Sequence, residues 1–569
     1  MNRRHFIERL SLGSGGLMAS SALAFPLSGQ AASFSKASGQ EYTADVVIAG
    51  GGLGGCAAAL AALRNQQTVI LTEETDWIGG QVTQQGVPPD EHDWIETHGA
   101  TRLYREFRTS VRRYYQQFYP LTEAAKSRTY FNPGDGTVSK ICHEPKVALA
   151  VLEQMLNPYL SSRQLRILLN YKVTAADVKG DEVKALKAIH RPTGTTIVLT
   201  APYFVDATEL GDLLPLTRTE FVTGAESRKE TNELHAPEKA DPNNVQAFTM
   251  CMALDYIPGS TFVIDKPKEY SFWSNYTPKF TPAWSGKLLD LSYSNPKTLV
   301  PKALGFHPEG IATGDKLNLW NYRRIINKAN FKAGFFPGDI TLVNWPQNDY
   351  TLGNLIGASE KDFTHHVNRA KQLSLSLLYW LQTEAPRPDG GAGWAGLRLR
   401  EDIMGTEDGL AKYPYIRESR RIKAAFTIRE EHVGAEQRAQ VTGKKETLAA
   451  PFKDSVGVGY YHIDLHPSTA QNNYIDFGSL PFQIPLGALI PQRVRNLLPA
   501  NKNIGTTHIT NGCYRLHPVE WSIGEAVGML VAFARQKQVI PRAVYEKSSL
   551  LEEFQKTVRS QGIETQWPA

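Results

Sequence analysis

The pattern of apolar and polar positions first becomes clear just beyond residue 40. Residues 44–49 form a mostly apolar, β-branched run that is typical of a buried parallel strand, and residues 56–64 are rich in Ala and Leu and predict a helix. A glycine-rich turn at residues 50–55 joins them, and residues 68–72 predict a second buried strand. A strand, a turn, a helix and a strand within about thirty residues predict a βαβ unit.

Farther along, the periodicity changes. Helices are predicted at residues 101–118 and 145–155, where apolar side chains recur with helical spacing. Between residues 165 and 205 the runs become short and alternating, with turn residues between them, which predicts a β-meander. The expected strands are residues 166–173, 182–190, 195–199 and 203–205.

Residues 220–480 differ from both flanks. They are richer in Pro, Trp and Tyr and only weakly periodic, with one long helix predicted at residues 363–383. Strand and helix character returns at residues 484–489 and 518–535. We therefore predict an α/β fold in which a Rossmann-like domain, a parallel sheet plus the β-meander, is interrupted by an inserted mixed α+β substrate or cap domain. The Rossmann-like domain would comprise residues 44–219 and 481–569, with residues 220–480 inserted.

Composition narrows the functional classes. The chain has 569 residues, 41% hydrophobic and 21% charged, which excludes a globally disordered, collagenous or coiled-coil protein. A formal charge of +5 without a basic run interleaved with aromatic residues gives no reason to expect nucleic-acid binding. The four cysteines are too few for a disulfide scaffold and lack the close pairs of a zinc site, and we expect no metal.

The first residues resemble an export signal. Residues 2–7 are charged and include adjacent arginines, and residues 11–27 are apolar and rich in Gly and Ala. Gly29 and Ala31 then stand at positions −3 and −1 of a possible cleavage site, so residues 1–31 are expected to be a signal peptide of the twin-arginine type. An anchor helix is the alternative, but the stretch is short for a span and contains Pro26.

This signal implies a periplasmic or secreted protein, with the twin-arginine export machinery as a partner. No later stretch approaches eighteen uncharged apolar residues, so we expect no stable membrane span.

The turn between the first strand and helix matches the pattern G-x-G-x-x-G through Gly50, Gly52 and Gly55. The first glycine permits the tight turn, the second lets a pyrophosphate approach, and the third allows close packing of helix and strand. Glu73 lies at the end of the second strand, where an acid can bind ribose hydroxyls. The turn therefore predicts a dinucleotide site, whereas the second match at residues 391–396 follows a loop and predicts none.

Further motifs identify a resemblance. Gly79, Gly80 and Gln81 follow the ribose acid, residues 205–208 resemble a second short fingerprint, and residues 496–505 and 515–528 resemble a closing segment. In this order they resemble the bacterial FAD-dependent oxidoreductase family, which has a glutathione-reductase-type FAD domain and is distantly similar to fumarate reductase flavoproteins. The resemblance implies FAD, with further contacts from Gly79, Gly80, Gln81, Val173, Asp206, Gly505 and Glu520.

Two departures from the family pattern qualify this expectation. The closing fingerprint usually begins with Gly-Asp or Gly-Arg, whereas this chain has Ala500-Asn501-Lys502. Loosely registered, Val82 takes the place of the histidine that carries a covalent flavin in fumarate reductase relatives. We therefore expect non-covalent FAD, with His92 or His98 as alternative attachment points.

Candidate catalytic residues flank the expected flavin-contacting turn. His508 or His517 could take a substrate hydroxyl proton, and Arg515 between them could bind an anionic or carbonyl oxygen. The alternative is a structural hydrogen-bonding role, which is the more common one for a lone histidine. In the resembling flavoproteins, the helix that begins near Pro518 points its N-terminus at the flavin. The charged segment 417–421 could bind a carboxylate or the FAD phosphates, or be a solvated helix face.

The sequence thus predicts an exported FAD-dependent oxidoreductase that transfers a hydride between a small organic substrate and non-covalently bound FAD. Dioxygen, a quinone or a periplasmic carrier would reoxidise the flavin as an external electron acceptor. The alternative is a secreted maturation or ligand-binding protein in which FAD is structural.

Overall fold

The glycine turn lies inside a parallel sheet. In the computed structural model, which describes residues 40–568, strand β2 (Val46–Ala49), helix α1 (Leu53–Arg64) and strand β3 (Val69–Glu73) follow one another. Strand β2 pairs in parallel with β3, so the predicted βαβ unit is confirmed. The expected signal peptide lies outside the described residues.

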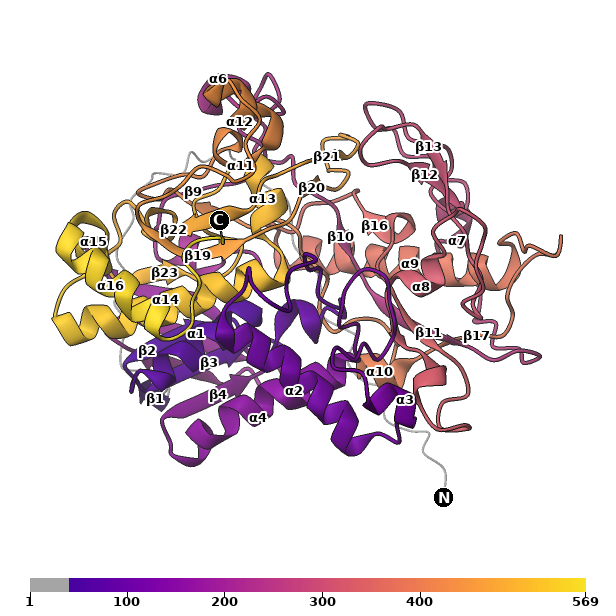
Figure 1. The fold of residues 1–569 in the computed structure, drawn as a ribbon, viewed down its shortest axis with the longest axis horizontal. Helices are drawn as coiled ribbons and strands as arrows, with labels where there is room; N and C mark the ends of the chain where they lie inside the picture. Colours follow the sequence, from indigo (N-terminus) through magenta and orange to yellow (C-terminus); the bar gives the residue numbers. More distant parts are fainter. Residues whose placement is uncertain (1–39, 569) are drawn as a thin grey trace, which may run out of the picture.

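The parallel sheet joins the two ends of the chain. Its order is β23-β8-β2-β3-β4, where β4 is Leu165–Leu169, β8 is Tyr203–Asp206 and β23 is Leu497–Pro499. All neighbouring strands run parallel, and the C-terminal strand β23 pairs with β8. Figure 1 shows the indigo N-terminal segments and the yellow C-terminal helices together on one side of the molecule.

Alternate residues of the sheet face two different layers. Val46 and Ile48 of β2 belong to the core formed with α1 and with α14 (His517–Lys537). Val47 and Ala49 face the other way, onto a second sheet whose order is β1-β7-β6-β5. Because both faces are covered, β2 is apolar at every position, as the sequence indicated. The second sheet comprises β1 (Gln40–Thr43), β5 (Tyr171–Lys179), β6 (Glu182–His190) and β7 (Thr196–Thr200).

The predicted β-meander is correct in its middle and wrong at both ends. Strands β5, β6 and β7 form an antiparallel meander. The expected run 166–173 is split at Asn170, whose backbone is left-handed with φ 62°, so its first half becomes β4 of the parallel sheet. The last expected strand is β8, also in the parallel sheet, because alternation does not reveal which sheet a strand joins.

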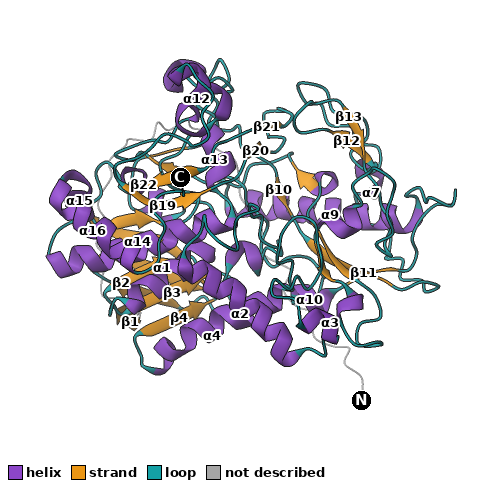
Figure 2. Cartoon of the chain, in the orientation of Figure 1, coloured by secondary structure: helices purple, strands orange, loops and turns teal. Residues whose placement is uncertain are grey.

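The inserted region contains its own sheet. Four antiparallel strands lie in the order β14-β15-β11-β17, beside the long helix α9 (Glu360–Thr383), on the right of Figure 2. The second glycine-rich match is a loop before β17, as predicted. The division at residues 219 and 480 stays a prediction. The strands are β11 (Met252–Tyr256), β14 (Arg324–Ile326), β15 (Ile340–Val343) and β17 (Leu397–Leu399).

Shorter elements complete the described chain. The other strands are β9 (Phe221–Val222), β10 (Phe248–Thr249), β12 (Ser292–Ser294), β13 (Pro301–Ala303), β16 (Asp349–Tyr350), β18 (Arg421–Ile422), β19 (Ser455–Gly459), β20 (Ile463–Leu465), β21 (Ile475–Phe477) and β22 (Phe482–Pro485). The longer remaining helices are α2 (Arg102–Phe118), α4 (Pro145–Ser161), α12 (Ala435–Thr442), α13 (His508–Tyr514), α15 (Pro541–Glu546) and α16 (Ser548–Ser560). The single-turn helices are α3 (Glu123–Lys126), α5 (Leu213–Leu216), α6 (Arg228–Thr231), α7 (Tyr270–Trp273), α8 (Leu319–Tyr322), α10 (Glu401–Met404), α11 (Glu430–Val433), η1 (Gly80–Val82), η2 (Lys328–Asn330), η3 (Pro346–Asn348) and η4 (Leu486–Leu489). Within residues 40–568, no helix is both long enough and apolar enough to cross a membrane.

Glycines allow the first and last long helices to touch. A Cβ atom on Gly524 of α14 would lie 2.0 Å from the carbonyl oxygen of Gly54 in α1, and one on Gly528 would lie 2.3 Å from that of Ala58. Such distances leave room only for hydrogen, so the helices pack backbone to backbone. This contact places the N-terminus of α14 beside the glycine turn.

Candidate active site

A groove lies where the strands of the parallel sheet end. The carboxyl ends of β2, β3 and β8 bring together Gly50, Glu73 and the turn after Asp206. Ligands of open α/β sheets bind at this edge. The lining includes Gly50, Gly52, Glu73, Val173, Thr208 and Glu209, so four residues singled out from the sequence meet here.

The glycine turn makes room at the start of α1. Gly50 has φ +96°, and a Cβ there would lie 2.3 Å from the carbonyl oxygen of Ala207. Gly55 packs against the turn itself, since its Cβ would lie 2.1 Å from the carbonyl oxygen of Gly50. Gly52 is the N-cap of α1 and supplies no side-chain cap. The helix therefore presents first-turn N–H groups and its positive dipole end, a suitable site for a phosphate.

Glu73 is held rigidly at the end of β3. Its carboxylate accepts hydrogen bonds from the backbone N–H of Gly51 at 2.9 Å and from the N–H and hydroxyl of Thr75 at 2.8 and 2.9 Å. Burial, followed by the charge of Glu74, raises the pKa of Glu73 to about 8 despite these bonds. A buried acid oriented in this way can bind ribose hydroxyls.

The Gly79–Gln81 segment links the groove to the C-terminal helix. Gly79 and Gly80 have φ +110° and +57°, and Gln81 follows in η1. The Gln81 amide donates to the carbonyl oxygen of Arg515 at 3.1 Å and to the carboxylate of Glu520. Glu520 also accepts a hydrogen bond from Gly54 N–H at 3.0 Å. The first turns of α1 and α14 are thereby joined through one carboxylate.

Burial dominates the electrostatics of that carboxylate. It raises the pKa of Glu520 to about 7, with Lys502 opposing the shift and Glu209 adding to it. The three groups therefore interact, and Glu209 is the one that lines the groove.

Asp206 and Gly505, also expected at the cofactor, are not part of the groove lining. Asp206 accepts hydrogen bonds from Thr208 N–H at 3.0 Å and Leu213 N–H at 3.1 Å, so it shapes the turn after β8. Gly505 does not line the groove, since a Cβ there would lie 2.5 Å from the Cβ of Ala424 in the inserted region. Its role is close packing.

Lys502 and Glu209 are site residues that the sequence reasoning missed. The Lys502 ammonium is only 2% exposed and bonds the Glu209 carboxylate. The Glu209 Oε1 atom makes no hydrogen bond and would lie 3.0 Å from a Cβ on Gly52. The sequence signal that could have pointed to Lys502 was the departure at Ala500-Asn501-Lys502, where the family pattern has Gly-Asp or Gly-Arg.

The groove fits the FAD that the sequence resemblance implies. It combines an uncapped helix N-terminus, an acid at the ribose position and a glycine turn without side chains. It also holds an unpartnered polar atom, Glu209 Oε1. Unsatisfied buried groups of this kind are expected where a polar ligand binds.

A second, larger cavity of about 450 Å³ lies beside the start of α14. Arg515, one residue before the N-cap Leu516, lines it. The Arg515 guanidinium bonds the Asp464 carboxylate at 3.0 Å, and its carbonyl binds Gln81 of the groove. Other polar and aromatic lining residues are Asp90, Tyr293, Asn295, Lys297, Lys302, Tyr322, Arg323, Asn344, Trp345, Tyr415, Arg417, Tyr461, His462, Asp464, His466, Tyr474 and Asp476.

The structure does not bring His508 and His517 to this cavity. His508 Nδ1 lies 2.8 Å from Glu418 Oε1, and Glu418 also binds Arg421. His517 is fully buried and accepts a hydrogen bond from Asp90 N–H through Nδ1. Burial lowers the pKa of His517 to about 3, so it is neutral at physiological pH. Although His508 and His517 are near Arg515 in sequence, neither lines the cavity that Arg515 lines.

His462 and His466 are the histidines in the cavity lining, and His466 is the one bonded to Asp349. Its Nδ1 lies 2.6 Å from Asp349 Oδ2 and its Nε2 lies 3.6 Å from Asp464 Oδ2. The alternation His462, Asp464, His466 across β20 places all three on one face, which is a strand signal that could have been noticed.

The structure shows where the residues of two alternatives left open by the sequence lie. Segment 417–421 is not a solvated helix face, because Arg417, Arg420 and Arg421 are buried and paired with Asp349, Asp212 and Glu418. His92 and His98 do not line the groove but contact Trp94 and Trp567 in an aromatic cluster.

Substituting Gly52 with Val should abolish FAD binding. The new side chain would crowd Glu209 and occupy the space at the start of α1 where a pyrophosphate is expected. Flavin content of the purified protein, read from its visible absorbance, is the measurement. Gly391→Val, at the first glycine of the second sequence match, should retain FAD. Stoichiometric FAD in Gly52→Val would contradict the assignment.

His517 should make the fold sensitive to acid. The unfolded chain takes up a proton near the usual pKa of 6.5, but the folded protein does not until about 3, so the free energy of unfolding falls as pH is lowered through this interval. Between roughly pH 7 and pH 4, the free energy of unfolding measured with urea should fall by about 3 kcal/mol less in His517→Gln than in the unchanged protein. The exposed His365, changed to Gln, is the control. If the free energy of unfolding fell equally with pH in the unchanged protein, His517→Gln and His365→Gln, the buried neutral state of His517 would be refuted.

Comparison with known proteins agrees with the cofactor site. No curated protein matches the chain. Among solved structures, E. coli quinol fumarate reductase FrdA (12% identity, 92% of this chain, 74% of that chain) and Mycobacterium smegmatis Sdh1 (10%, 92%, 78%) both have TM-scores of 0.29. L-proline dehydrogenase from P. horikoshii has 16% identity, and the match covers 34% of this chain, only 26% of that chain, with a TM-score of 0.18. Scores this low carry no argument. The model of the FAD dependent oxidoreductase family matches residues 45–558, so the chain belongs to this family and uses FAD.

Proposed function

We propose that this protein is an exported oxidoreductase that transfers a hydride between a small organic substrate and non-covalently bound FAD. The observation that carries the proposal is the position of Arg515. Its side chain lines the 450 Å³ cavity, while its carbonyl is bonded to Gln81 beside the FAD groove. A substrate in the cavity would therefore lie next to the start of α14.

The cofactor, when bound, would supply the acceptor or donor of the hydride. The chain's own contribution begins with α14, whose N-terminal dipole and Glu520 face the start of α1. Lys502 is buried there as well and is paired with Glu209. The positive end of the helix dipole favours negative charge that develops at this end of the groove.

The charges of the cavity point to a neutral substrate. Its buried cations are three arginines, each with a carboxylate partner: Arg323 with Asp90 at 3.1 Å, Arg417 with Asp349 at 3.0 Å, and Arg515 with Asp464 at 3.0 Å. Lys297 and Lys302 also line the cavity, but both are exposed to solvent and form no ion pair in the described part of the chain. Fixed donors and acceptors of both signs, with tyrosines between them, suit a polyhydroxylated molecule such as a sugar or polyol. A substrate carboxylate would have to displace one of the existing pairs.

His466 is placed to handle a proton. Asp349 accepts the hydrogen bond of Nδ1–H, which leaves Nε2 as the acceptor. Oxidation of an alcohol carbon requires removal of the hydroxyl proton as the hydride leaves, and His466 Nε2 can take it. Arg515 can hold the oxygen that becomes a carbonyl.

Non-covalent attachment is supported by the aromatic cluster that holds His92 and His98 away from the groove lining. Denaturing the protein should therefore release its FAD and leave no flavin attached to the chain.

Anaerobic mixing with candidate substrates should bleach the visible absorbance of the FAD-loaded protein. Neutral sugars or polyols are expected to reduce the flavin, and dicarboxylates are not. Arg515→Lys should retain FAD but slow the bleaching about 100-fold, because the planar fork that positions the oxygen is lost.

The matched control is Arg387→Lys, an arginine that pairs with Asp389 outside the cavity lining and should leave the rate unchanged. Bleaching by no substrate would favour the structural-flavin alternative. Admitting dioxygen or a quinone after bleaching would identify the acceptor by return of the colour.

Export through the twin-arginine route can be tested in a bacterial host. Replacing Arg3 and Arg4 with Lys should leave the uncleaved precursor in the cytoplasm, because the pair is read by the export receptor. The unchanged protein should be periplasmic or secreted and begin at Ala32 by N-terminal sequencing. Arg9→Lys serves as the control. Export of the double variant at the normal level would contradict this route.

A further inference from the structure

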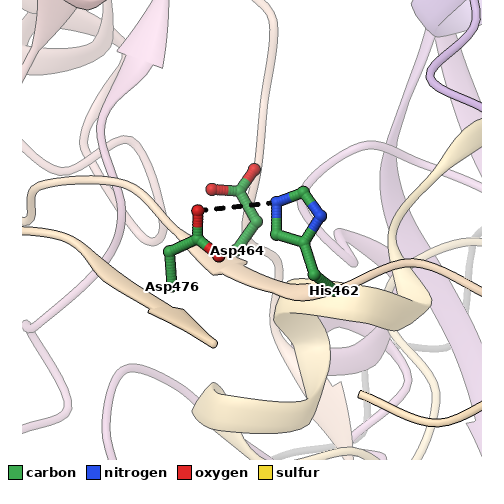
Figure 3. Close-up of side chains that lie close together, drawn as sticks. All are labelled: His462, Asp464 and Asp476. Carbon is green, nitrogen blue, oxygen red and sulfur yellow. Dashed lines mark ion pairs between the residues drawn. The ribbon is translucent and has the colours of Figure 1, made fainter. Parts of the chain in front are cut away.

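Three potential metal ligands converge at the wall of the 450 Å³ cavity. His462 precedes β20, Asp464 lies in β20 and Asp476 lies in β21. One ligand atom from each lies within 4.8 Å of the other two. Figure 3 shows the imidazole and the two carboxylates facing one another across the hairpin.

The two carboxylates oppose each other directly. Asp464 and Asp476 are register partners in the antiparallel β20–β21 pair. Like charges directly opposite on neighbouring strands repel and destabilise the pairing. A hairpin that contributed only to folding would have no reason to place two acids there.

The surrounding cations neutralise only one of these acids. Arg515 bonds Asp464 Oδ2 at 3.0 Å and His466 Nε2 lies 3.6 Å from the same oxygen, so Asp464 Oδ1 remains free. Besides His462, Lys297 also acts on the charge of Asp476, and it lines the same cavity but forms no ion pair with Asp476 in the described structure.

Asp476 is the strongest indication of a missing ligand. Its side chain is only 8% exposed, and its Oδ1 atom has no hydrogen-bond partner. Its other oxygen lies 3.7 Å from His462 Nε2, which is too long for a hydrogen bond but short enough for two ligands of one ion. A buried carboxylate with an oxygen that makes no hydrogen bond is costly, and a bound cation would offset that cost.

We propose that His462 Nε2, Asp464 Oδ1 and Asp476 bind a divalent cation at the wall of the cavity. One imidazole and two carboxylates favour a first-row transition ion such as Mn²⁺ over Mg²⁺ or Ca²⁺, which prefer all-oxygen sites. His462 is 37% exposed, so the ion can enter from solvent. Three protein ligands on one side leave coordination positions directed at the cavity.

The functional consequence rests on the proposed function. The open coordination positions could hold a hydroxyl or carbonyl oxygen of a polyhydroxylated substrate. The site also shares Asp464 with Arg515, so ion and guanidinium would bind oxygens of one molecule. The binding of the ion itself is independent of any reaction and can be measured without a substrate.

The test uses Mn²⁺ added to FAD-loaded protein that has been stripped of metal with a chelator. Loss of the free Mn²⁺ signal in electron paramagnetic resonance should show a single bound equivalent. Asp476→Asn and His462→Gln should each weaken binding by at least about 10-fold, because each removes a ligand. Mn²⁺ should raise the melting temperature of the unchanged protein but not that of Asp476→Asn.

The control is Glu431→Gln, which removes a carboxylate lying 3.8 Å from His432, a similar contact without a third ligand. Its Mn²⁺ affinity should be unchanged. Absence of Mn²⁺ binding, or equal binding by Asp476→Asn, would overturn the proposal and leave the two aspartates sharing a proton. If the protein bound no Mn²⁺ but a substrate still bleached its flavin, the metal site would be refuted and the proposed function would stand.

Discussion

The structure depends on the close contact of α1 and α14. Gly54 and Gly524 bring two backbones together where any Cβ would collide, and Glu520 of one helix binds the Gly54 N–H of the other. Because α1 begins at the glycine turn and α14 lies almost five hundred residues later, this contact closes the FAD domain from both ends of the chain. It also aims two helix N-termini at one edge of the parallel sheet, which creates the positive potential that the cofactor needs.

The same edge explains the chemistry of the neighbouring cavity. Arg515 stands directly before α14, so the helix that helps to form the FAD groove also fixes a guanidinium in the cavity wall. Around it, buried charges come in pairs, since an isolated one would be too costly. Asp476 has only the 3.7 Å contact with His462, and its Oδ1 atom makes no hydrogen bond, which singles out the β20–β21 hairpin as the proposed cation site.

Much of the cofactor site could be read from the sequence because its signals are local. The turn containing Gly50, Gly52 and Gly55, and Glu73 at the end of the next strand, act through backbone geometry within one βαβ unit. The cavity residues could not be read in this way. Asp90, Arg323 and His466 come from distant segments, and only packing of the inserted region brings them together.

The sequence by itself determined the α/β fold, the FAD turn and the apolar helices, because strand and helix periods and glycine requirements are encoded residue by residue. Tertiary structure decided which strands share a sheet, as the split at Asn170 shows. It also decided which histidine meets the cavity. His508 and His517 are near Arg515 in sequence, yet burial and ion pairing hold them elsewhere, while His466 reaches the cavity through the hairpin. Side-chain partners are set by three-dimensional packing, which no local pattern encodes.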